Sequence, residues 1–534
     1  MTRSRLRTYA LLLALHAVAG CGKHADPVKP GCVVDADCGG ERVCREQLCV
    51  VVDDAPRRLG FNLIPSGGSP YPPQTVPVAG VRLDEPLTIG IDPGVKVSGA
   101  IQILGGSGDA NGQLKFKQRA LKNAFVRETR VDMNRYEVFV LPGRYDVTFF
   151  PDNASLPTRV WRDIALELDS DPKFQMNTRT VEIGGTLSRT DSATAESSRV
   201  RGALVFAVSR DTGSVSSTAV TNEAGDFTIH VLEDSGLYDL HVAPAEPNRF
   251  DPEQVPNYVP EASFESAFRV DGAQWENLLY PEAASLGLSL GEYGYAPIEF
   301  QFRLSADTDM DIDWTGSSVS LETEAGRGKL TIRHRVDSSG RFTLPLILGT
   351  YAVEVRTPPG LPVASARIEA LTFSATSPTV TFDLGLRELV EGAVQSHDGT
   401  FVAGAQLSAV PLSGGRLAEP LNVPTDERGF FHLWLDDVPY RITISPADPT
   451  LPRGVVDWEP GSASLETIRL AEPALTWGKV LGTPTNGDAS EDWRELPDVV
   501  IRAFEESAAG EPIVLGESKT DAQGAFRIVL PARE

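Results

Sequence analysis

Three short patterns in the sequence have residue types and spacings that could support chemistry, and the first is centred on Ser289. This serine lies in the stretch GLSLG, which has the G-x-S-x-G spacing of a nucleophile elbow. Such a serine must sit on a sharp turn between a strand and a helix, beside a histidine base and an acid. Leucines at positions 286, 288 and 290 alternate around it and no helical period follows, which predicts a plain strand.

The second pattern pairs His230 with Glu233 at the H-x-x-E spacing of two zinc ligands in metallopeptidases, with His334 as a conceivable third ligand. His230 lies between Ile229 and Val231 in an alternating stretch, so we expect its side chain to face solvent. A metallopeptidase unit also needs helices, and the chain after residue 21 has no helical periodicity. We therefore predict no catalytic residue and no cofactor.

The third pattern is a run of aspartates whose carboxylates could bind calcium: Asp307, Asp309, Asp311 and Asp313. An EF-hand loop would need glycine at its sixth position and glutamate at its twelfth, where this chain has Ile312 and Ser318. A solvated acidic face is the alternative, and it is the interpretation that we favour. No metal site is therefore predicted, although the four aspartates stay a calcium candidate of low specificity.

Cysteines cluster near the N-terminus, where Cys32, Cys38, Cys44 and Cys49 follow Cys21. An even number of cysteines in a short loop of an exported chain is typical of a disulfide-stapled module, and four cysteines allow three pairings. A zinc site is the alternative, but the cluster has no C-x-x-C pair. The C-x-x-D-x-D-C-x(5)-C spacing resembles small cysteine-rich modules that follow the lipidated cysteine in surface lipoproteins of myxobacteria and their relatives.

Residues 1–20 have the features of an export signal. Three arginines precede an apolar run over residues 9–19, which is too short to span a bilayer. The stretch VAGC at residues 18–21 resembles the bacterial lipobox, in which the cysteine is acylated, and the alternative is a secretory signal with a chance cysteine. The lipobox resemblance predicts lipidation at Cys21. Gly22 and Lys23 are not the aspartate that tends to retain bacterial lipoproteins at the inner membrane, so we predict an outer-membrane lipoprotein, periplasmic or surface-exposed.

Length and charge restrict the remaining possibilities. A chain of 534 residues is too long for one hydrophobic core, which predicts several domains. The formal net charge of -24 argues against nucleic acid as a partner, because a polyanion would be repelled. No stretch after the signal is apolar over the length of a transmembrane helix.

A hairpin pattern recurs five times along the chain. Four copies begin with an Asp/Asn-x-x-Gly turn, at Asn222–Gly225, Asp337–Gly340, Asp426–Gly429 and Asp521–Gly524, whereas the first has Asp132 followed by Arg135. The acidic or amide side chain can cap the turn, and glycine accepts positive φ. Alternating apolar residues follow each turn, then a second reversal and a strand that begins with tyrosine, whose hydroxyl can bond to the preceding turn.

The copies are spaced by roughly 90 to 115 residues, which suits one sandwich domain each. Stretches such as IGGTLSR at residue 183 and VEGAVQS at residue 390 predict a first strand upstream of each hairpin. Together these motifs resemble the carboxypeptidase regulatory-like domain, a transthyretin-like seven-stranded sandwich. The resemblance covers most of residues 90–534, and it implies that the motif residues are structural and that no ligand residue carries over.

We therefore predict an all-β protein with a tandem array of seven-stranded Greek-key β-sandwiches after the disulfide-rich module. The predicted boundaries are 1–20 for the signal, 21–50 for the module, 51–85 for a Pro/Gly lead-in, and 86–172, 173–283, 284–386, 387–472 and 473–534 for the sandwiches. The last sandwich lacks the strand that should follow FRIVLPARE. Truncation or a tolerated short strand is the favoured explanation, and an open edge that takes a partner strand is the alternative.

Two functions are compatible with this organisation, and an enzyme is the least favoured third. The first is a non-catalytic structural or adhesive array displayed at the cell envelope through the lipid anchor. The second is a polysaccharide-binding protein, because tryptophans could stack on sugar rings: Trp275, Trp314, Trp434, Trp458 and Trp477. Glycans or other surface proteins are the expected partners, together with the membrane at the anchor.

Overall fold

The structure is a computed structural model. It describes residues 42–45, 48–51, 56–83, 85–103, 110–119, 125–153, 156–167, 173–191, 196–233, 236–244, 261–293, 295–305, 310–325, 328–374, 379–413, 417–462, 465–483, 493–507 and 510–533. The chain divides into two compact units, Met1–Val52 and Asp53–Glu534. Among the described residues, no helix is long and apolar enough to cross a membrane.

The first unit contains one described hairpin, formed by β1 (Arg42–Arg45) and β2 (Leu48–Val51). Cys44 and Cys49 lie opposite each other in its register, and both are disulfide-bonded. Cys32 and Cys38 lie outside the described residues, as do Cys21 and the predicted signal, so the pairing and the lipidation stay predictions.

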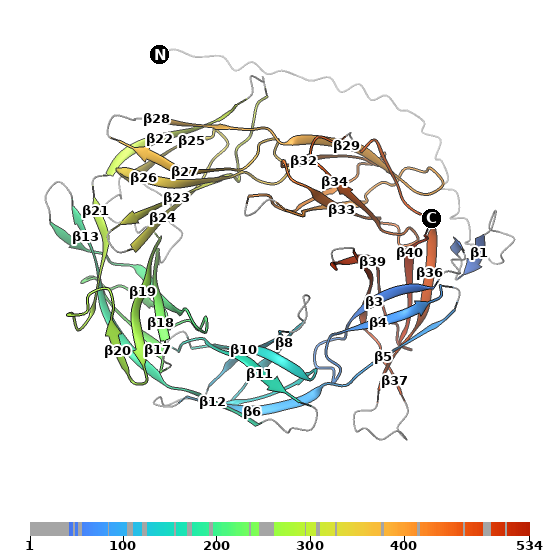
Figure 1. The fold of residues 1–534 in the computed structure, drawn as a ribbon, viewed down its shortest axis with the longest axis horizontal. Coiled ribbons are helices and arrows are strands. Elements are labelled where there is room, and N and C mark those ends of the chain that lie inside the picture. The colour runs from blue at the N-terminus through green and yellow to red at the C-terminus, as the bar shows by residue number, and fades with distance from the viewer. Residues whose placement is uncertain are drawn as a thin grey trace, which may run out of the picture. The chain divides into compact units, whose positions relative to one another are not determined.

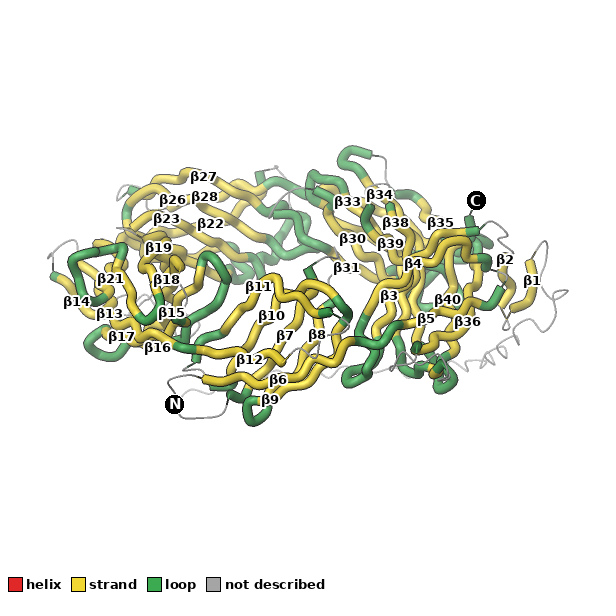
Figure 2. The backbone as a smooth tube through the Cα atoms, turned by 60° about the horizontal axis from the view of Figure 1, so that its bottom comes forward, coloured by secondary structure: helices red, strands yellow, loops and turns green. Residues whose placement is uncertain are grey.

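The second unit is all-β over its described residues, as predicted (Figure 2). Its described residues form five separate hydrophobic cores, each enclosed by strands of two sheets. The first sandwich has sheets in the orders β12-β6-β9 and β11-β10-β7-β8. Its strands are β6 (Val95–Ile103), β7 (Gly112–Gln118), β8 (Val126–Val131), β9 (Arg135–Val140), β10 (Gly143–Pro151), β11 (Arg159–Leu166) and β12 (Lys173–Thr178).

The second and third sandwiches share one sheet, in the order β16-β15-β18-β19-β24-β23-β26-β27. The strands of the second sandwich are β13 (Thr180–Asp191), β14 (Ser197–Arg199), β15 (Ala203–Ser209), β16 (Ala219–Val220), β17 (Asp226–Leu232), β18 (Gly236–Pro244), β19 (Glu261–Asp271), β20 (Gln274–Asn277) and β21 (Leu286–Tyr293). Its other sheet has the order β14-β13-β17, with β21 also paired to β13. The strands of the third sandwich are β22 (Tyr295–Leu304), β23 (Ser318–Ala325), β24 (Gly328–Arg335), β25 (Arg341–Ile347), β26 (Gly349–Arg356), β27 (Ala366–Phe373) and β28 (Thr379–Leu384). Its other sheet has the order β25-β22-β28. The antiparallel pair β19 and β24 joins the two.

The fourth sandwich has sheets in the orders β32-β29-β35 and β31-β30-β33-β34. Its strands are β29 (Glu388–Gln395), β30 (Gln406–Pro411), β31 (Leu421–Pro424), β32 (Phe430–Leu435), β33 (Tyr440–Ser445), β34 (Gly454–Trp458) and β35 (Thr467–Arg469). The C-terminal region forms β36 (Pro473–Gly482), β37 (Arg494–Glu495), β38 (Val500–Glu506), β39 (Pro512–Lys519) and β40 (Ala525–Pro531).

The fifth sandwich takes its remaining strands from the beginning of the unit (Figure 1). They are β3 (Arg57–Ile64), β4 (Gln74–Val81) and β5 (Leu87–Ile91). One sheet has the order β39-β38-β3-β4, and in the other β5 pairs with β36. The segment predicted as an irregular lead-in over residues 51–85 therefore contains two strands, because its alternating apolar residues are buried against the C-terminal strands.

A common plan explains why β3, β4 and β5 fit there. In each of the first four sandwiches the first strand pairs in parallel with the last: β6 with β12, β13 with β21, β22 with β28, and β29 with β35. In the fifth, β36 pairs in parallel with β5. Similarly, β3 lies beside β38 as β33 lies beside β30, and β4 follows as β34 does. The missing strands therefore come from this chain, which differs from both predicted explanations.

Three predicted boundaries also differ from the strand pairing. Strand β5 lies inside the range 86–172 predicted for the first sandwich, but it pairs with β36 of the fifth. Strand β12 completes the first sandwich beyond residue 172, and β21 completes the second beyond residue 283. The reason is that the last strand of each sandwich returns to its own first strand, which lies far back in the sequence. Residues 261–293, which lie between the second and third hairpins, contain β19, β20 and β21.

The predicted turns are present in the described hairpins. The turn glycines have positive φ, at 74° for Gly225, 68° for Gly340, 81° for Gly429 and 67° for Gly524. In the first copy the non-glycine residues Met133 and Asn134 take this conformation, with φ of 45° and 68°. The hydroxyl of Tyr145 donates a hydrogen bond of 2.8 Å to the carbonyl of Leu141 in the preceding reversal, as expected.

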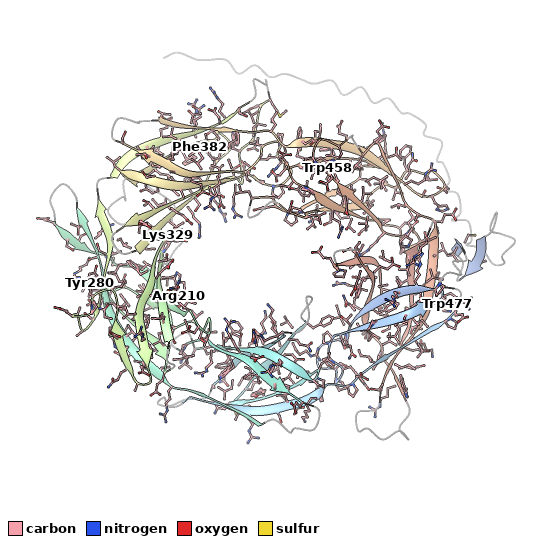
Figure 3. All side chains as sticks on the ribbon, in the orientation of Figure 1. Arg210, Tyr280, Lys329, Phe382, Trp458 and Trp477 are labelled. Carbon is pink, nitrogen blue, oxygen red and sulfur yellow. The ribbon has the colours of Figure 1, made fainter. Side chains whose placement is uncertain are left out.

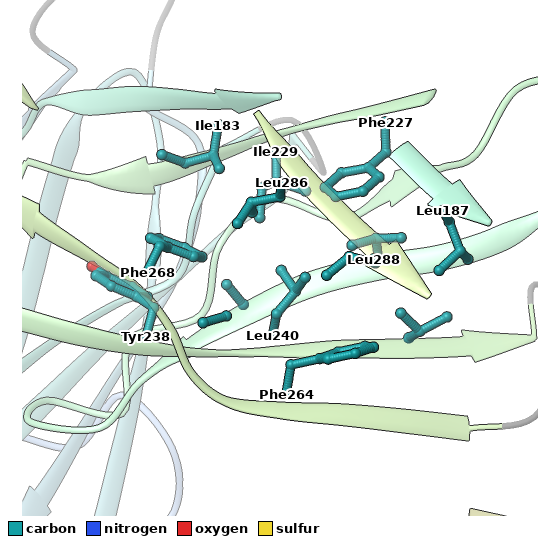
Figure 4. Packing of buried hydrophobic residues seen from close by; sticks show 14 of the residues in the cluster. Ile183, Leu187, Phe227, Ile229, Tyr238, Leu240, Phe264, Phe268, Leu286 and Leu288 are labelled. Atoms are coloured by element: carbon teal, nitrogen blue, oxygen red, sulfur yellow. The ribbon is translucent and has the colours of Figure 1, made fainter. Parts of the chain in front are cut away.

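Alternation along the strands produces each core by placing every second side chain between the sheets. In the second sandwich Phe227 and Ile229 on β17 meet Leu286 and Leu288 on β21 and Leu240 on β18 (Figure 4). All five are buried. The repeated hairpin motif thus supplies core residues, in agreement with its predicted structural role.

Candidate functional site

The structure does not assemble the catalytic patterns found in the sequence. Ser289 lies within β21, between the buried Leu288 and Leu290, and so occupies a strand as predicted. His230 lies on β17 and its backbone N–H donates to the hydroxyl of Ser217. His334 lies on β24 of the third sandwich and stacks on the ring of Phe342.

The metal candidates are equally dispersed in the part of the chain that can be described. Glu233 lies 3.7 Å from the guanidinium of Arg179. Asp313 accepts a hydrogen bond from the backbone N–H of Thr315. Hydrogen bonding to the side chain and to the backbone of Thr315 lowers the pKa of the Asp313 carboxyl. Asp311 is exposed, whereas Asp307 and Asp309 lie outside the described residues. No group of three or more His, Cys, Asp or Glu side chains there could hold a metal ion.

The five tryptophans proposed as sugar platforms are all at least partly covered. Trp314 and Trp458 are buried in the third and fourth cores, and Figure 3 shows Trp458 in its sandwich. Trp275, Trp434 and Trp477 are half-buried. A platform of two exposed tryptophans is therefore not formed by these five residues.

Comparison of the repeats identifies a different surface. In each hairpin strand the first, third and fifth residues after the turn glycine point outward. These outward positions hold Asp226, Thr228 and His230 in β17, and Ala525, Arg527 and Val529 in β40. In β32 they hold Phe430, His432 and Trp434. The fourth sandwich alone among these three replaces small, polar or aliphatic side chains with three aromatic rings.

Local geometry places a further ring beside this row. Phe401 and Phe430 stack with centroids 5.5 Å apart and 27° between ring planes, although their side chains are 48% and 49% exposed. Gly429 allows this approach, because a Cβ atom there would lie 3.1 Å from the Cβ of Phe401, and its φ is 81°. The turn that closes the hairpin thus also leaves the room that Phe401 needs to stack on Phe430.

The loop that carries Phe401 is held by local hydrogen bonds. Asp398 accepts one from the Ser396 hydroxyl at 2.5 Å and one from the Thr400 backbone N–H at 3.0 Å. The Ser396 hydroxyl is the main cause that lowers the pKa of Asp398 to about 2, so the carboxylate stays ionised at neutral pH. The ring of Phe401 is therefore presented by a loop that needs little ordering before it binds.

Strand β29 extends the same outward face. Leu389 lies opposite Trp434, and Glu391 lies opposite His432. Leu389 is 40% exposed. We call the set Leu389, Phe401, Phe430, His432 and Trp434 the aromatic face. Sequence inspection had selected Trp434 alone, but the outward phase of GFFHLWL after the turn contained the signal.

A polar cleft of about 500 Å³ lies over β23, β24, β26 and β27 of the third sandwich, and Figure 3 labels Lys329 at this cleft. Each basic residue of its lining is already paired with a carboxylate: Lys329 with Glu322, Arg333 with Glu261, Arg356 with Glu354, and Arg367 with Glu369. An anionic ligand would have to break these pairs, so the aromatic face is the stronger candidate.

Comparisons with known proteins do not assign a family. No family model matches the chain, and no curated protein matches it. Solved structures that align include the Bacillus anthracis TIE protein, with 12% identity, 69% of this chain, 72% of that chain and a TM-score of 0.17. Others are a Streptococcal ancillary pilin, with 12% identity, 55% and 99% coverage and a TM-score of 0.17, and a shaft pilin from Lactobacillus rhamnosus GG, with 9% identity, 33% and 97% coverage and a TM-score of 0.20. Scores this low do not indicate a shared function.

Proposed function

We propose that the protein is a non-catalytic cell-envelope lipoprotein, anchored through Cys21, that displays its β-sandwiches as a structural and adhesive array. The observation that carries this proposal is the use of the recurring motif. Its turn residues close hairpins and its alternating residues fill cores, as Gly225 and Phe227 do in the second copy. A module repeated for its shape suits display better than catalysis.

Polysaccharide binding at the aromatic face is the second candidate function. Sugar rings present apolar C–H faces, which stack on aromatic rings, and hydroxyl groups, which need polar partners. Exposed Phe401 and Phe430 offer the first kind of contact. His432 and Glu391, which are opposite each other on β32 and β29, offer the second. The same face could alternatively contact an apolar patch on another surface protein.

Two experiments test the parts of this proposal. Intact cells are surface-labelled and then fractionated. The labelled wild-type chain should be in the membrane fraction, and the Cys21→Ser variant should be in the soluble fraction. If the variant stays membrane-bound, the lipid anchor is wrong. For adhesion, the chain from residue 22 is applied to a glycan array and to immobilised envelope polysaccharide.

The decisive comparison uses the double variant Phe401→Ala with Phe430→Ala. Loss of two stacking rings should weaken any binding by at least about tenfold, which is about 1.4 kcal/mol. Phe150→Ala is the matched control, because Phe150 is 44% exposed on β10 of another sandwich. Equal binding by the wild type, the double variant and the control would show that the aromatic face is not the binding site.

A further inference from the structure

The fifth sandwich is completed by strands that are distant in sequence from its other strands. Residues 57–91 provide β3, β4 and β5, whereas β36 to β40 begin at residue 473. In the other four sandwiches the equivalent strands follow directly in sequence. The contact between residues 57–91 and β36 to β40 therefore differs in kind from every other intrasandwich contact, because no short linker holds its two sides together.

The contact has the properties of a folding core. Leu59, Phe61 and Leu63 of β3 are 2%, 0% and 0% exposed, and they share one cluster with Ile501 and Ile528 of the C-terminal strands. Side chains and backbone both fix the register, with Phe61 opposite Ala503 on β38. Removal of either side would expose apolar faces and unpaired strand edges.

Strand β5 and the loop before β4 contribute three further close contacts. The hydroxyl of Tyr71 donates a hydrogen bond of 2.9 Å to the carbonyl of Thr483. A Cβ atom on Gly482 would lie 2.3 Å from the Tyr71 ring, and one on Gly478 would lie 1.7 Å from the Leu87 carbonyl. The acceptor strands are thus shaped for this particular donor segment.

The donor segment is tied on its other side to the first sandwich. Only residues 92–94 separate β5 from β6. The backbone N–H of Gly94 donates to the carbonyl of Pro70 at 2.8 Å, and the Arg127 guanidinium donates to the carbonyl of Ser69 at 2.8 Å. The segment therefore belongs covalently and by hydrogen bonds to the first sandwich, while it completes the fifth.

We propose that residues 57–91 of one copy can complete the fifth sandwich of a second copy, so that this contact is a self-assembly interface as well as an internal one. Nothing in the pairing or the core depends on whether both sides belong to one polypeptide. The choice is set by effective concentration, and the connection within one copy runs through residues 95–472, far longer than a short linker. A donor and an acceptor at opposite ends of one chain make a heterologous contact, which links copies head to tail.

Cysteine trapping separates the two arrangements. Asn62 and Arg502 lie opposite each other on β3 and β38, within the Cα separation that a disulfide spans. Full-length Asn62→Cys and full-length Arg502→Cys proteins are mixed, unfolded in denaturant, and refolded together at increasing concentration with mild oxidation. Only exchange between copies can join position 62 of one variant to position 502 of the other.

The expected result is a disulfide-linked heterodimer, identified by mass spectrometry of the joined peptide, that rises with concentration and reaches at least roughly a tenth of the chains at 100 µM. The control mixture pairs Asn62→Cys with Thr343→Cys, an exposed position on β25. The double variant in one chain reports folding, because it should close internally at low concentration. If the double variant closes but the mixture forms no more heterodimer than the control, the proposal is wrong.

Discussion

Truncation of one buried ring on β3 should destabilise strands β3 to β5 and strands β36 to β40 together. Phe61 is 0% exposed in the core that β3 shares with β38 and β40. Phe61→Ala should cost about 3–5 kcal/mol, because it removes a buried ring and leaves a cavity. Since each 1.4 kcal/mol is about a factor of ten, the opening equilibrium of the fifth sandwich should rise roughly a hundred- to several-thousand-fold.

Native-state hydrogen exchange read by mass spectrometry measures this effect region by region. Amide protection should fall in residues 57–91 and in residues 473–531 by the same factor, because both belong to one cooperative sandwich. The matched control is Phe116→Ala, since Phe116 is also 0% exposed but lies in the core of the first sandwich. Its loss should lower protection in residues 95–178 and leave residues 473–531 unchanged.

Either of two patterns would refute the reasoning. If Phe61→Ala lowers protection in residues 57–91 alone and residues 473–531 keep their wild-type rates, the two segments do not share a core. A uniform loss of protection over every sandwich would also contradict it, because the five cores would then unfold as one unit.

Two further outcomes are expected from close contacts and from burial. Gly478→Ala should lower the thermal midpoint of the fifth sandwich by calorimetry, because its Cβ would lie 1.7 Å from the Leu87 carbonyl, whereas Gly184→Ala, with no atom within 4 Å, should not. Burial lowers the pKa of His334, which stacks on Phe342, so the unfolded state binds more protons below about pH 6.5 and stability should fall as the pH drops through that region. Denaturant titrations at several pH values should show that the free energy of unfolding falls with falling pH in the wild type and falls less in His334→Gln. An equal fall in both proteins would show that His334 is not its cause.

Much of the local structure could be predicted because its causes are local. Turns such as Asp426–Gly429 need a capping side chain and a glycine that accepts positive φ, and the four copies with the Asp/Asn-x-x-Gly sequence have both. Ser289 could be assigned to a strand because its neighbours alternate. Of the aromatic face only Trp434 was selected from the sequence. The outward phase of Phe430 follows from its turn and could have been found, but Phe401 joins it through a contact between loop and strand.

What the residues determine without any tertiary information is the kind of unit: a period-two strand pattern, tight turns and a recurring tyrosine can bury their apolar faces only as two-layer β structure. What they leave open is which strands share a sheet, because strand pairing joins residues without regard to their separation in sequence. The pairing of β36 with β5 connects positions about 390 residues apart, as Gly478 and Leu87 show. Only the folded chain decides that residues 57–91 complete the fifth sandwich, since the shape of that acceptor exists only once its own strands are in place.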